Sequence, residues 1–210
     1  MNAPTPVTQS KPLAVIDQKP WLVLVAAFLG WMFDGLEMGI FSLVARPALQ
    51  ELLKVSNDAG VGQWMGYITA SFLIGAALGG LAFGWLGDRI GRVRAMALSI
   101  LTYSLFTGFC YFATEPWHLA GLRFIAALGM GGEWSLGVAL VMECWPEKHR
   151  PWLAAAIGAA ANLGYAVIAL VGRYIPRENW RLVMLAGAVP ALLTFFIRLF
   201  VPESQRWKES

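Results

Sequence analysis

Six long apolar segments dominate the sequence, and their length constrains the fold more than any other feature. An α-helix needs about 20 mainly apolar residues to cross the hydrocarbon core of a bilayer. The expected spans are Trp21–Ala45, Val61–Leu86, Ala95–Ala113, Leu119–Met142, Leu153–Val171 and Leu182–Val201. Only 14% of the residues are charged, whereas a soluble domain averages about 25%. We therefore predict an all-α membrane protein with six transmembrane helices.

Lys and Arg are distributed unevenly between the two sets of connecting segments. One side of the membrane would carry Lys11, Lys19, Arg89, Arg92, Arg94, Lys148, Arg150, Arg206 and Lys208. The other side would carry Arg46, Lys54, Arg173 and Arg177. Because cytoplasmic loops hold the excess of Lys and Arg, both termini are expected in the cytoplasm. The chain then divides into an N-terminal tail (1–20), a six-helix bundle (21–201) and the start of a cytoplasmic linker (202–210). The tail has no apolar core, so no cleavable signal peptide is expected.

Several function classes conflict with the residue content. The net charge of +3 comes from dispersed residues rather than one basic stripe, which argues against nucleic-acid binding. Cys110 and Cys144 lack metal-site spacing, so neither a disulfide framework nor a zinc cluster is expected. An intramembrane protease is not expected, because His118 and His149 both lie at span ends. We expect no enzyme, and a lipid bilayer as the surrounding partner.

Four charged side chains lie well inside the expected spans: Asp34, Glu37, Arg123 and Glu133. A charge at mid-helix costs about 2.5–3.5 kcal/mol on insertion scales, so such a residue indicates a functional site. Asp34 and Glu37 are three residues apart and share one helix face. That face must look into the bundle or a water-filled cavity. A carboxyl group held between burial and a nearby cation can bind and release a proton.

The depth of these residues leaves two interpretations open. At a rise of about 1.5 Å per residue, Glu37 and Arg123 lie roughly 6 and 10 Å outside the midplane, and Glu133 roughly 4 Å on its cytoplasmic side. Glu37 and Arg123 can therefore form an ion pair that merely joins two helices. Three acids against one base nevertheless leave carboxylates that need another partner, such as a proton. In an isolated six-helix bundle, we expect all four groups to face lipid or a wet groove.

Glycines recur inside the second and fourth spans. The spacings Gly75-x-x-x-Gly79 and Gly80-x-x-x-Gly84 bring small residues onto one helix face, which permits close helix approach. We interpret most of these glycines, including those near Gly131, as packing positions.

A short charged segment separates the second and third spans. Its residues are Gly84-Trp-Leu-Gly-Asp88-Arg89-Ile-Gly91-Arg92-Val-Arg94. Gly91 supplies backbone freedom for the turn, and Asp88 can cap the incoming helix. The pattern G-x-x-x-D-R-x-G-R-x-R at this place resembles the signature loop of the major facilitator superfamily. Two further elements resemble branches of that superfamily: Glu143 and Arg150 in the spacing E-x6-R, and Pro202-Glu203-Ser-x-Arg206 after the last span.

The resemblance implies a cytoplasmic ionic network that holds the outward-open state and so controls gating. Its members in this chain would be Gly84, Asp88, Arg89, Gly91, Arg92, Arg94, Glu143, Arg150, Glu203 and Arg206.

The most specific resemblance is to the sialic acid:proton symporters and related carboxylate carriers. The stretch from Arg123 to Glu133 resembles their fourth span, and Asp34-Gly-Leu-Glu37 resembles a D-G-F-D motif that they share with aromatic-acid symporters. This implies a secondary transporter for small organic acids in a bacterial inner membrane, driven by proton symport. The proton would be the coupling ion, and no cofactor is expected. Asp34, Glu37, Arg123 and Glu133 would bind substrate and couple protons. The Gly-Pro pair of drug/proton antiporters is absent from the fifth span.

Members of this superfamily have twelve spans in two six-helix halves, and six spans are expected here. The chain would then be the N-terminal half, and its partner would be a missing C-terminal half or a second copy. A fragment, a half carrier that pairs with another chain, and a truncated non-transporting remnant stay open. A sugar or aromatic-acid porter of the same superfamily is the alternative among transporters.

Overall fold

The computed structural model describes residues 20–201, with the side chains of residues 20, 177, 195 and 198 left out. All regular elements in this range are helical. They are α1 (Pro20–Leu53), α2 (Val61–Ile90), α3 (Arg92–Phe109), η1 (Cys110–Phe112), α4 (Pro116–Cys144), η2 (Glu147–His149), α5 (Arg150–Val171), η3 (Arg177–Asn179), α6 (Trp180–Ala186) and α7 (Ala191–Phe200). Five of these helices, α1 to α5, are long and apolar enough to cross a membrane. The expected all-helical membrane architecture is confirmed for these five spans.

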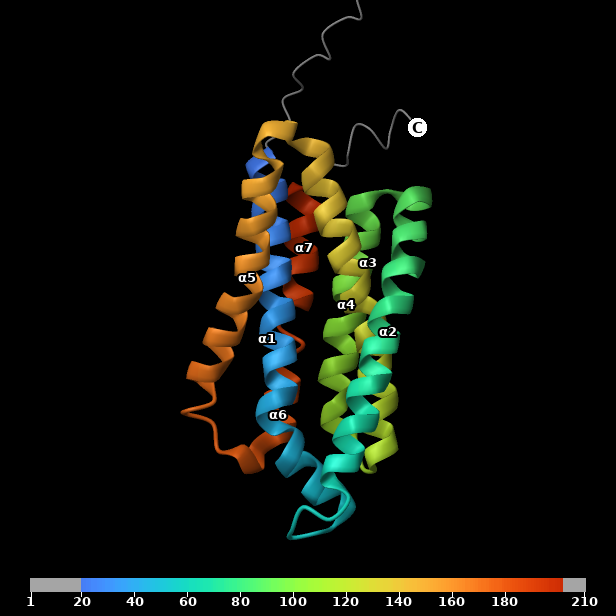
Figure 1. Cartoon of the computed structure of the whole chain (residues 1–210), viewed down its shortest axis with the longest axis vertical. Coiled ribbons are helices and arrows are strands. Elements are labelled where there is room, and N and C mark those ends of the chain that lie inside the picture. Colours follow the sequence, from blue (N-terminus) through green and yellow to red (C-terminus); the bar gives the residue numbers. More distant parts are fainter. Residues whose placement is uncertain (1–19, 202–210) are drawn as a thin grey trace, which may run out of the picture.

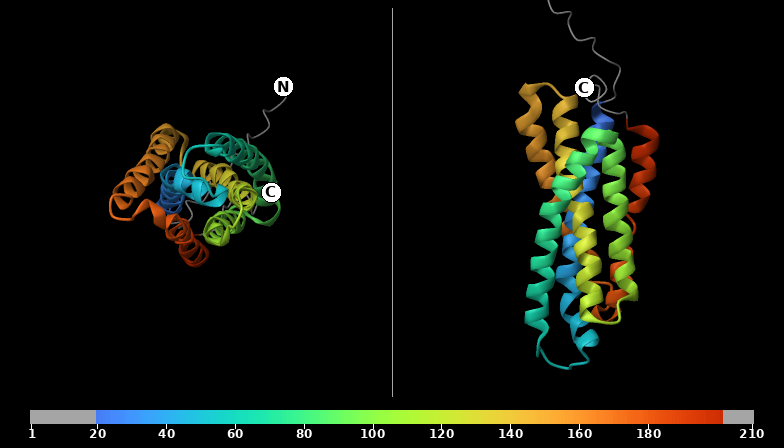
Figure 2. Two further views of the ribbon diagram at one scale, coloured as in Figure 1. Left: turned by 90° about the horizontal axis from the view of Figure 1, so that it is seen from below. Right: turned by 90° about the vertical axis from the view of Figure 1, so that its right-hand side faces the viewer.

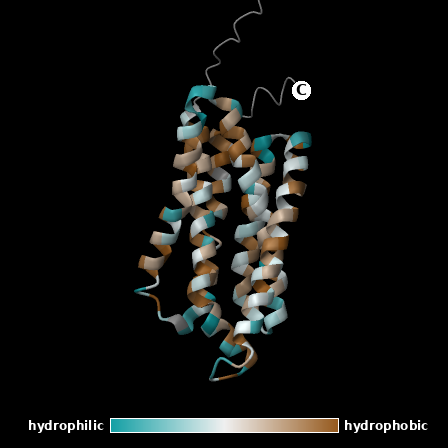
Figure 3. Ribbon diagram, viewed as in Figure 1, coloured by the Kyte–Doolittle hydropathy of each residue, from teal (hydrophilic) through white to brown (hydrophobic). Residues whose placement is uncertain are grey.

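The long helices run up and down side by side, and α1 and α4 occupy the middle of the bundle (Figure 1). Helix α4 packs against α2 and α3, and α5 packs along α1. Seen along the bundle, α2 and α5 lie on one side of the central pair, and α3, α6 and α7 lie on the other (Figure 2). The α2–α3 and α4–α5 connections lie at one end, which we call the upper end after Figure 1. Hydrophilic residues gather mainly at the two ends (Figure 3).

The expected sixth span, Leu182–Val201, is not one helix. It forms α6 and α7, separated by a turn from Gly187 to Pro190 in which backbone N–H groups bond three residues back, such as Ala188 N to Leu185 O at 3.0 Å. Pro190 lacks an N–H donor and so interrupts α-helical bonding. Gly187 packs so closely against Thr107 of α3 that a Cβ atom at position 187 would collide with the methyl group of Thr107. The expected sixth spanning helix is therefore not confirmed for this segment.

Helix α1 continues two turns beyond its predicted end at Ala45. It passes through Pro47 and reaches Leu53. Ala48 and Leu49 in this extension are fully buried, so packing outweighs the hydrogen bond that Pro47 cannot make. The helix ends where Lys54 adopts a φ of 57°, a left-handed conformation that closes many helices.

The buried apolar side chains form two clusters, one toward each end of the bundle. The upper cluster includes Met96 and Met130, and the lower cluster includes Leu49 and Trp180. Along α4, the residues before position 123 belong to the lower cluster and those after it to the upper cluster. Arg123 therefore lies where the two clusters meet, which places the charged residues in the middle of the bundle.

Candidate functional site

Glu37 and Arg123 meet at the junction of the two apolar clusters. Arg123 Nη1 donates a hydrogen bond to Glu37 Oε1, and Thr107 Oγ1 donates to the same oxygen at 2.8 Å. These side chains come from α1, α4 and α3, and all three are buried. The ion pair between Glu37 and Arg123 is therefore confirmed, and Thr107 joins it. Glu37 Oε2 and Arg123 Nε have no hydrogen-bond partner among the described residues.

The Arg123 guanidinium also lies between two aromatic rings. Its central carbon is 4.6 Å from the ring centre of Phe41 and 4.9 Å from that of Phe72, within the range of cation–π attraction. Arg123 borders a cavity of about 140 Å³ between α1, α2, α4 and α5. The cavity is lined by Met38, Phe41, Ser42, Ile68, Thr69, Phe72, Leu73, Arg123 and Tyr165. We call it the Arg123 cavity.

Asp34 and Glu133 form a second buried acidic group nearer the upper end. Asp34 is 1% exposed and Glu133 fully buried, and none of their four carboxylate oxygens has a hydrogen-bond partner among residues 20–201. Glu133 and Glu37 both lie near Asp34, and Tyr103 of α3 lies near Glu133. The Glu133 carboxylate lies against Gly30, where a Cβ atom would collide with Oε1.

The four charged residues are enclosed by the helices of this chain alone. Asp34, Glu37, Arg123 and Glu133 are each at most 2% exposed in the isolated chain. The expectation that they would face lipid or a wet groove is therefore wrong. The reason is the tight packing of α1 against α4 and of α3 against α4, which closes around these side chains.

Part of the expected ionic network lies at the upper end. Arg92 Nη2 bonds Asp88 Oδ1 at 2.8 Å within the α2–α3 corner, and Arg92 Nε bonds Glu143 Oε1 of α4 at 3.3 Å. The corner turns at Gly91, whose φ is 104°, a value that residues with a Cβ rarely adopt. Arg92 thus joins the α2–α3 corner to the end of α4.

The other residues expected in that network are arranged separately. Arg150 bonds Glu147 at 3.2 Å rather than Glu143, and Arg89 stacks 4.1 Å over the ring of Trp85. Arg94 is exposed and borders a groove near Thr194. A Cβ atom added at Gly84 would lie 3.9 Å from Ser135 Oγ, which is an ordinary van der Waals contact. Glu203 and Arg206 lie outside the described residues.

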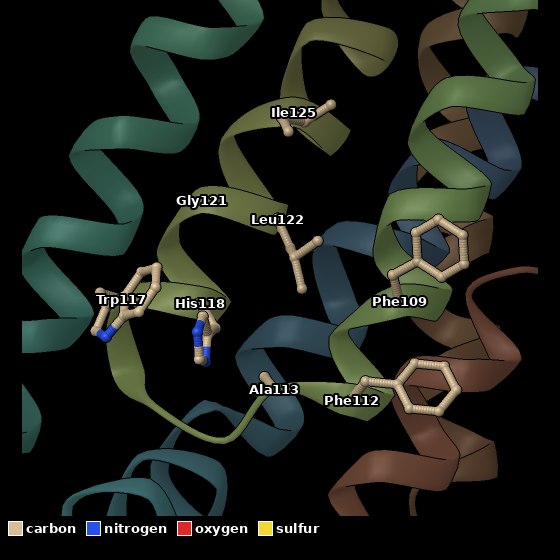
Figure 4. A pocket seen from close by; sticks show the side chains of 8 residues that line it. All are labelled: Phe109, Phe112, Ala113, Trp117, His118, Gly121, Leu122 and Ile125. Atoms are coloured by element: carbon tan, nitrogen blue, oxygen red, sulfur yellow. The ribbon is translucent and has the colours of Figure 1, made fainter.

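A larger groove lies on the outer surface between α4 and the end of α3 (Figure 4). Its volume is about 490 Å³, and it is lined by Phe109, Phe112, Ala113, Trp117, His118, Gly121, Leu122 and Ile125. No Asp, Glu, Lys or Arg lines it, and His118 is within 3.1 Å of Thr114 Oγ1. Because this groove has no buried charged side chain, whereas the smaller cavity is bordered by the buried Arg123, we assign the candidate site to the Arg123 cavity.

Sequence reasoning missed Tyr103, Thr107 and the aromatic walls of the Arg123 cavity. Ser99, Tyr103 and Thr107 follow one another at intervals of four residues, so they share one face of α3. All three are fully buried. Polar residues at this spacing inside an apolar span are the signal that could have indicated a face turned toward buried charges.

Comparison with known proteins gives a consistent result. The model of the Major Facilitator Superfamily matches residues 20–210. The niacin transporter NiaP of Acinetobacter baylyi is 36% identical over 177 residues, which cover 84% of this chain and 39% of that transporter. The sialic acid transporter NanX of Escherichia coli is 32% identical over 190 residues, covering 89% of this chain and 45% of NanX. The chain therefore spans less than half the length of these relatives.

A solved structure supports the fold. The proton:xylose symporter XylE superimposes with a TM-score of 0.80 at 20% sequence identity, over 90% of this chain and 46% of XylE. At this identity the likeness concerns the arrangement of helices alone.

Proposed function

The chain belongs to the Major Facilitator Superfamily, and from this membership we propose that it forms the first six-helix half of a secondary transporter for small organic acids. Its relatives include transporters of niacin and of sialic acid, and both compounds are carboxylic acids. In this proposal the helices cross a bacterial inner membrane with the upper end in the cytoplasm. The surplus of Lys and Arg that the sequence predicts for this side of the membrane supports this orientation.

The Arg123 cavity is the observation that carries the proposal. A guanidinium binds a carboxylate through two parallel hydrogen bonds, and Arg123 Nε has no protein partner among the described residues. A buried cation beside a cavity in a membrane protein marks a substrate or ion pathway. We therefore assign carboxylate binding to Arg123, with Glu37 as the residue that neutralises it when the cavity is empty.

We assign proton coupling first to Asp34 and Glu133. Both carboxyls are buried without a hydrogen-bond partner in the described part of the chain, and burial of an unpaired charge is expensive. A proton removes that charge, so the two residues can alternate between a protonated and a charged form as water gains access. Glu37 ranks third, because Arg123 already compensates its charge.

The ion pairs of Arg92 are proposed to stabilise one conformational state rather than to bind substrate. Arg92 joins the α2–α3 corner to α4, and contacts of this kind can differ between the open states of a carrier. Coupling between a gate and a distant site typically amounts to about 1–3 kcal/mol.

Transport by proteoliposomes that contain the chain together with a second six-helix half tests the proposal. Labelled niacin and labelled sialic acid serve as probes under an inwardly directed proton gradient. Asp34→Asn and Glu133→Gln should retain exchange across the membrane but lose accumulation above the external concentration. Arg123→Gln should lose both.

Unchanged accumulation in both carboxyl variants would remove Asp34 and Glu133 from the coupling mechanism. Uptake of xylose but of no carboxylate would favour a sugar porter instead. The absence of all uptake by the unaltered protein would favour a non-transporting remnant.

A further inference from the structure

We propose that the Arg123 cavity selects planar, unsaturated carboxylates, with aromatic monocarboxylates as the preferred class, over polyhydroxylated acids. This inference rests on the proposed function, because it assumes that Arg123 binds a carboxylate. It goes further in naming Tyr165 and Phe72 as the residues that determine specificity.

Aromatic rings from three helices surround the position where the acid would lie. Phe41 of α1 and Phe72 of α2 flank the guanidinium, and Tyr165 of α5 borders the same cavity. A carboxylate bound to Arg123 therefore holds the rest of its molecule among ring faces and edges. Stacked or edge-to-face aromatic pairs are favourable beyond simple burial, so a flat unsaturated ligand gains contacts that a puckered one does not.

The cavity offers few hydrogen-bonding groups to a hydroxylated ligand. Apart from Arg123, its polar side chains are the hydroxyls of Ser42, Thr69 and Tyr165. Ser42 Oγ already donates to Met38 O at 3.2 Å. A sugar acid would leave several of its hydroxyls without partners against Met38, Ile68 and Leu73, and an unpaired polar group in an apolar site is costly. The lining of this half therefore disfavours polyhydroxylated acids.

Tyr165 also separates the Arg123 cavity from a second cavity. Tyr165 and Ser42 line both, and the second one, of about 290 Å³, lies between α1 and α5 beside Gly39, Leu43 and Ile168. The ring packs against Gly39, where a Cβ atom would lie 3.2 Å from Tyr165 Cδ1. Removing the ring would join the two cavities, so Tyr165 limits the thickness of the ligand as well as contacting it.

The test measures equilibrium binding of three radiolabelled carboxylates to the purified chain in lipid nanodiscs. Benzoate is planar, cyclohexanecarboxylate has nearly the same size but is puckered, and gluconate is polyhydroxylated. We expect benzoate to bind the unaltered chain about tenfold more tightly than either comparison compound, as expected for aromatic contacts of this kind. Tyr165→Leu and Phe72→Leu should each reduce that preference roughly three- to tenfold.

Two variants separate a specific role from a general disturbance. Tyr165→Phe keeps the ring and should retain the preference for benzoate. Tyr174→Leu removes a tyrosine that is 85% exposed and lies outside both cavities, so all three affinities should stay unchanged.

Equal affinity of the unaltered chain for the three acids, lost in Arg123→Gln, would overturn the proposed selectivity and leave carboxylate binding intact. A preference for benzoate that persists in Tyr165→Leu and Phe72→Leu would overturn the assignment of these two residues. Failure of all three acids to bind would contradict the proposed function together with this inference.

Discussion

The pair of Glu37 and Arg123 is buried but incompletely satisfied. One oxygen of Glu37 accepts hydrogen bonds from both Arg123 and Thr107, whereas its other oxygen and Arg123 Nε have no partner in the described structure. The attraction within a buried ion pair offsets the free-energy cost of its desolvation only when further hydrogen bonds satisfy the remaining polar atoms of the pair. An ion pair that served only to join two helices would be expected to have these atoms hydrogen-bonded. The unpaired Nε of Arg123, a residue that borders the cavity, instead fits a site that binds an acid.

Removing either member of this pair should strongly destabilise the fold. Glu37→Gln and Arg123→Gln each leave a buried charge without its counter-ion, which costs about 3–5 kcal/mol. The double variant should lose less free energy of unfolding than the two single variants lose together. Arg46→Gln is the matched control, because the Arg46–Asp58 pair is 65% and 59% exposed and such pairs contribute about 0–1 kcal/mol. Equilibrium unfolding in mixed detergent micelles measures these losses, and additive effects in the double variant would contradict direct coupling.

The charged residues of the site could be predicted from the sequence, and their surroundings could not. Asp34 and Arg123 stand out because a charge in an apolar run is costly, and helical spacing placed Asp34 with Glu37. Phe72 and Tyr165 carry no such signal, because aromatic residues are common in membrane spans. Their role depends on which helices pack together, and single-sequence periodicity does not specify that.

The helices of the bundle approach most closely where glycines replace side chains. A Cβ atom at Gly79 of α2 would collide with the Leu128 carbonyl, and one at Gly131 of α4 would collide with the Ala76 carbonyl. The two positions face each other's helices, so α2 and α4 touch through their backbones. The packing interpretation is confirmed for Gly79 and Gly131, whereas Gly84 makes only ordinary contact.

Gly131→Ala should therefore separate α2 from α4. The added methyl group would press on backbone rather than on a flexible side chain, and overpacking of this kind costs about 1–3 kcal/mol. Gly158→Ala in α5 is the matched control, because nothing lies within 4 Å of the added Cβ, and alanine in a helix is more stable than glycine by roughly 0.5–1 kcal/mol. Thermal unfolding followed by circular dichroism compares the two. Similar midpoints for both variants would show that the close contact contributes nothing.

At the level of elements, the sequence predicts five of the spans well because their apolar runs are long and contain few charged residues. Helix α1 exceeds its predicted end, since burial of Leu49 outweighs the effect of Pro47. The sixth segment is apolar enough to resemble a span, but its hydropathy does not show where the helical hydrogen bonds of the backbone are interrupted. The break between α6 and α7 comes from Pro190 and from the contact of Gly187 with α3.

Across the whole molecule, α2 and α5 are the least covered of the long helices. Only 22% of the most apolar stretch of each is buried, against 61% for α4. Asn162 on α5 is exposed in the middle of a span, three residues before Tyr165 and so on the same face of the helix. A polar side chain at that depth normally faces the interior of a bundle or a water-filled cavity rather than lipid. The face formed by α2 and α5, which borders the Arg123 cavity, is thus suited to a second helical bundle.

We therefore expect a second six-helix bundle to cover this face, supplied either by a C-terminal half or by a second copy. Single cysteines at Leu73 of α2 and Asn162 of α5, introduced in a Cys110→Ala/Cys144→Ser background, should form cross-linked products with a short bifunctional reagent in native membranes. Leu192→Cys is the control, because Leu192 is 68% exposed and belongs to α7, the helix on the opposite side of the bundle (Figure 2). The mass of each product identifies the partner as a copy or as another protein. Equal cross-linking at Leu192, or none at Leu73 and Asn162, would show that the α2–α5 face is exposed to lipid, since an interface excludes lipid from one side of the bundle only.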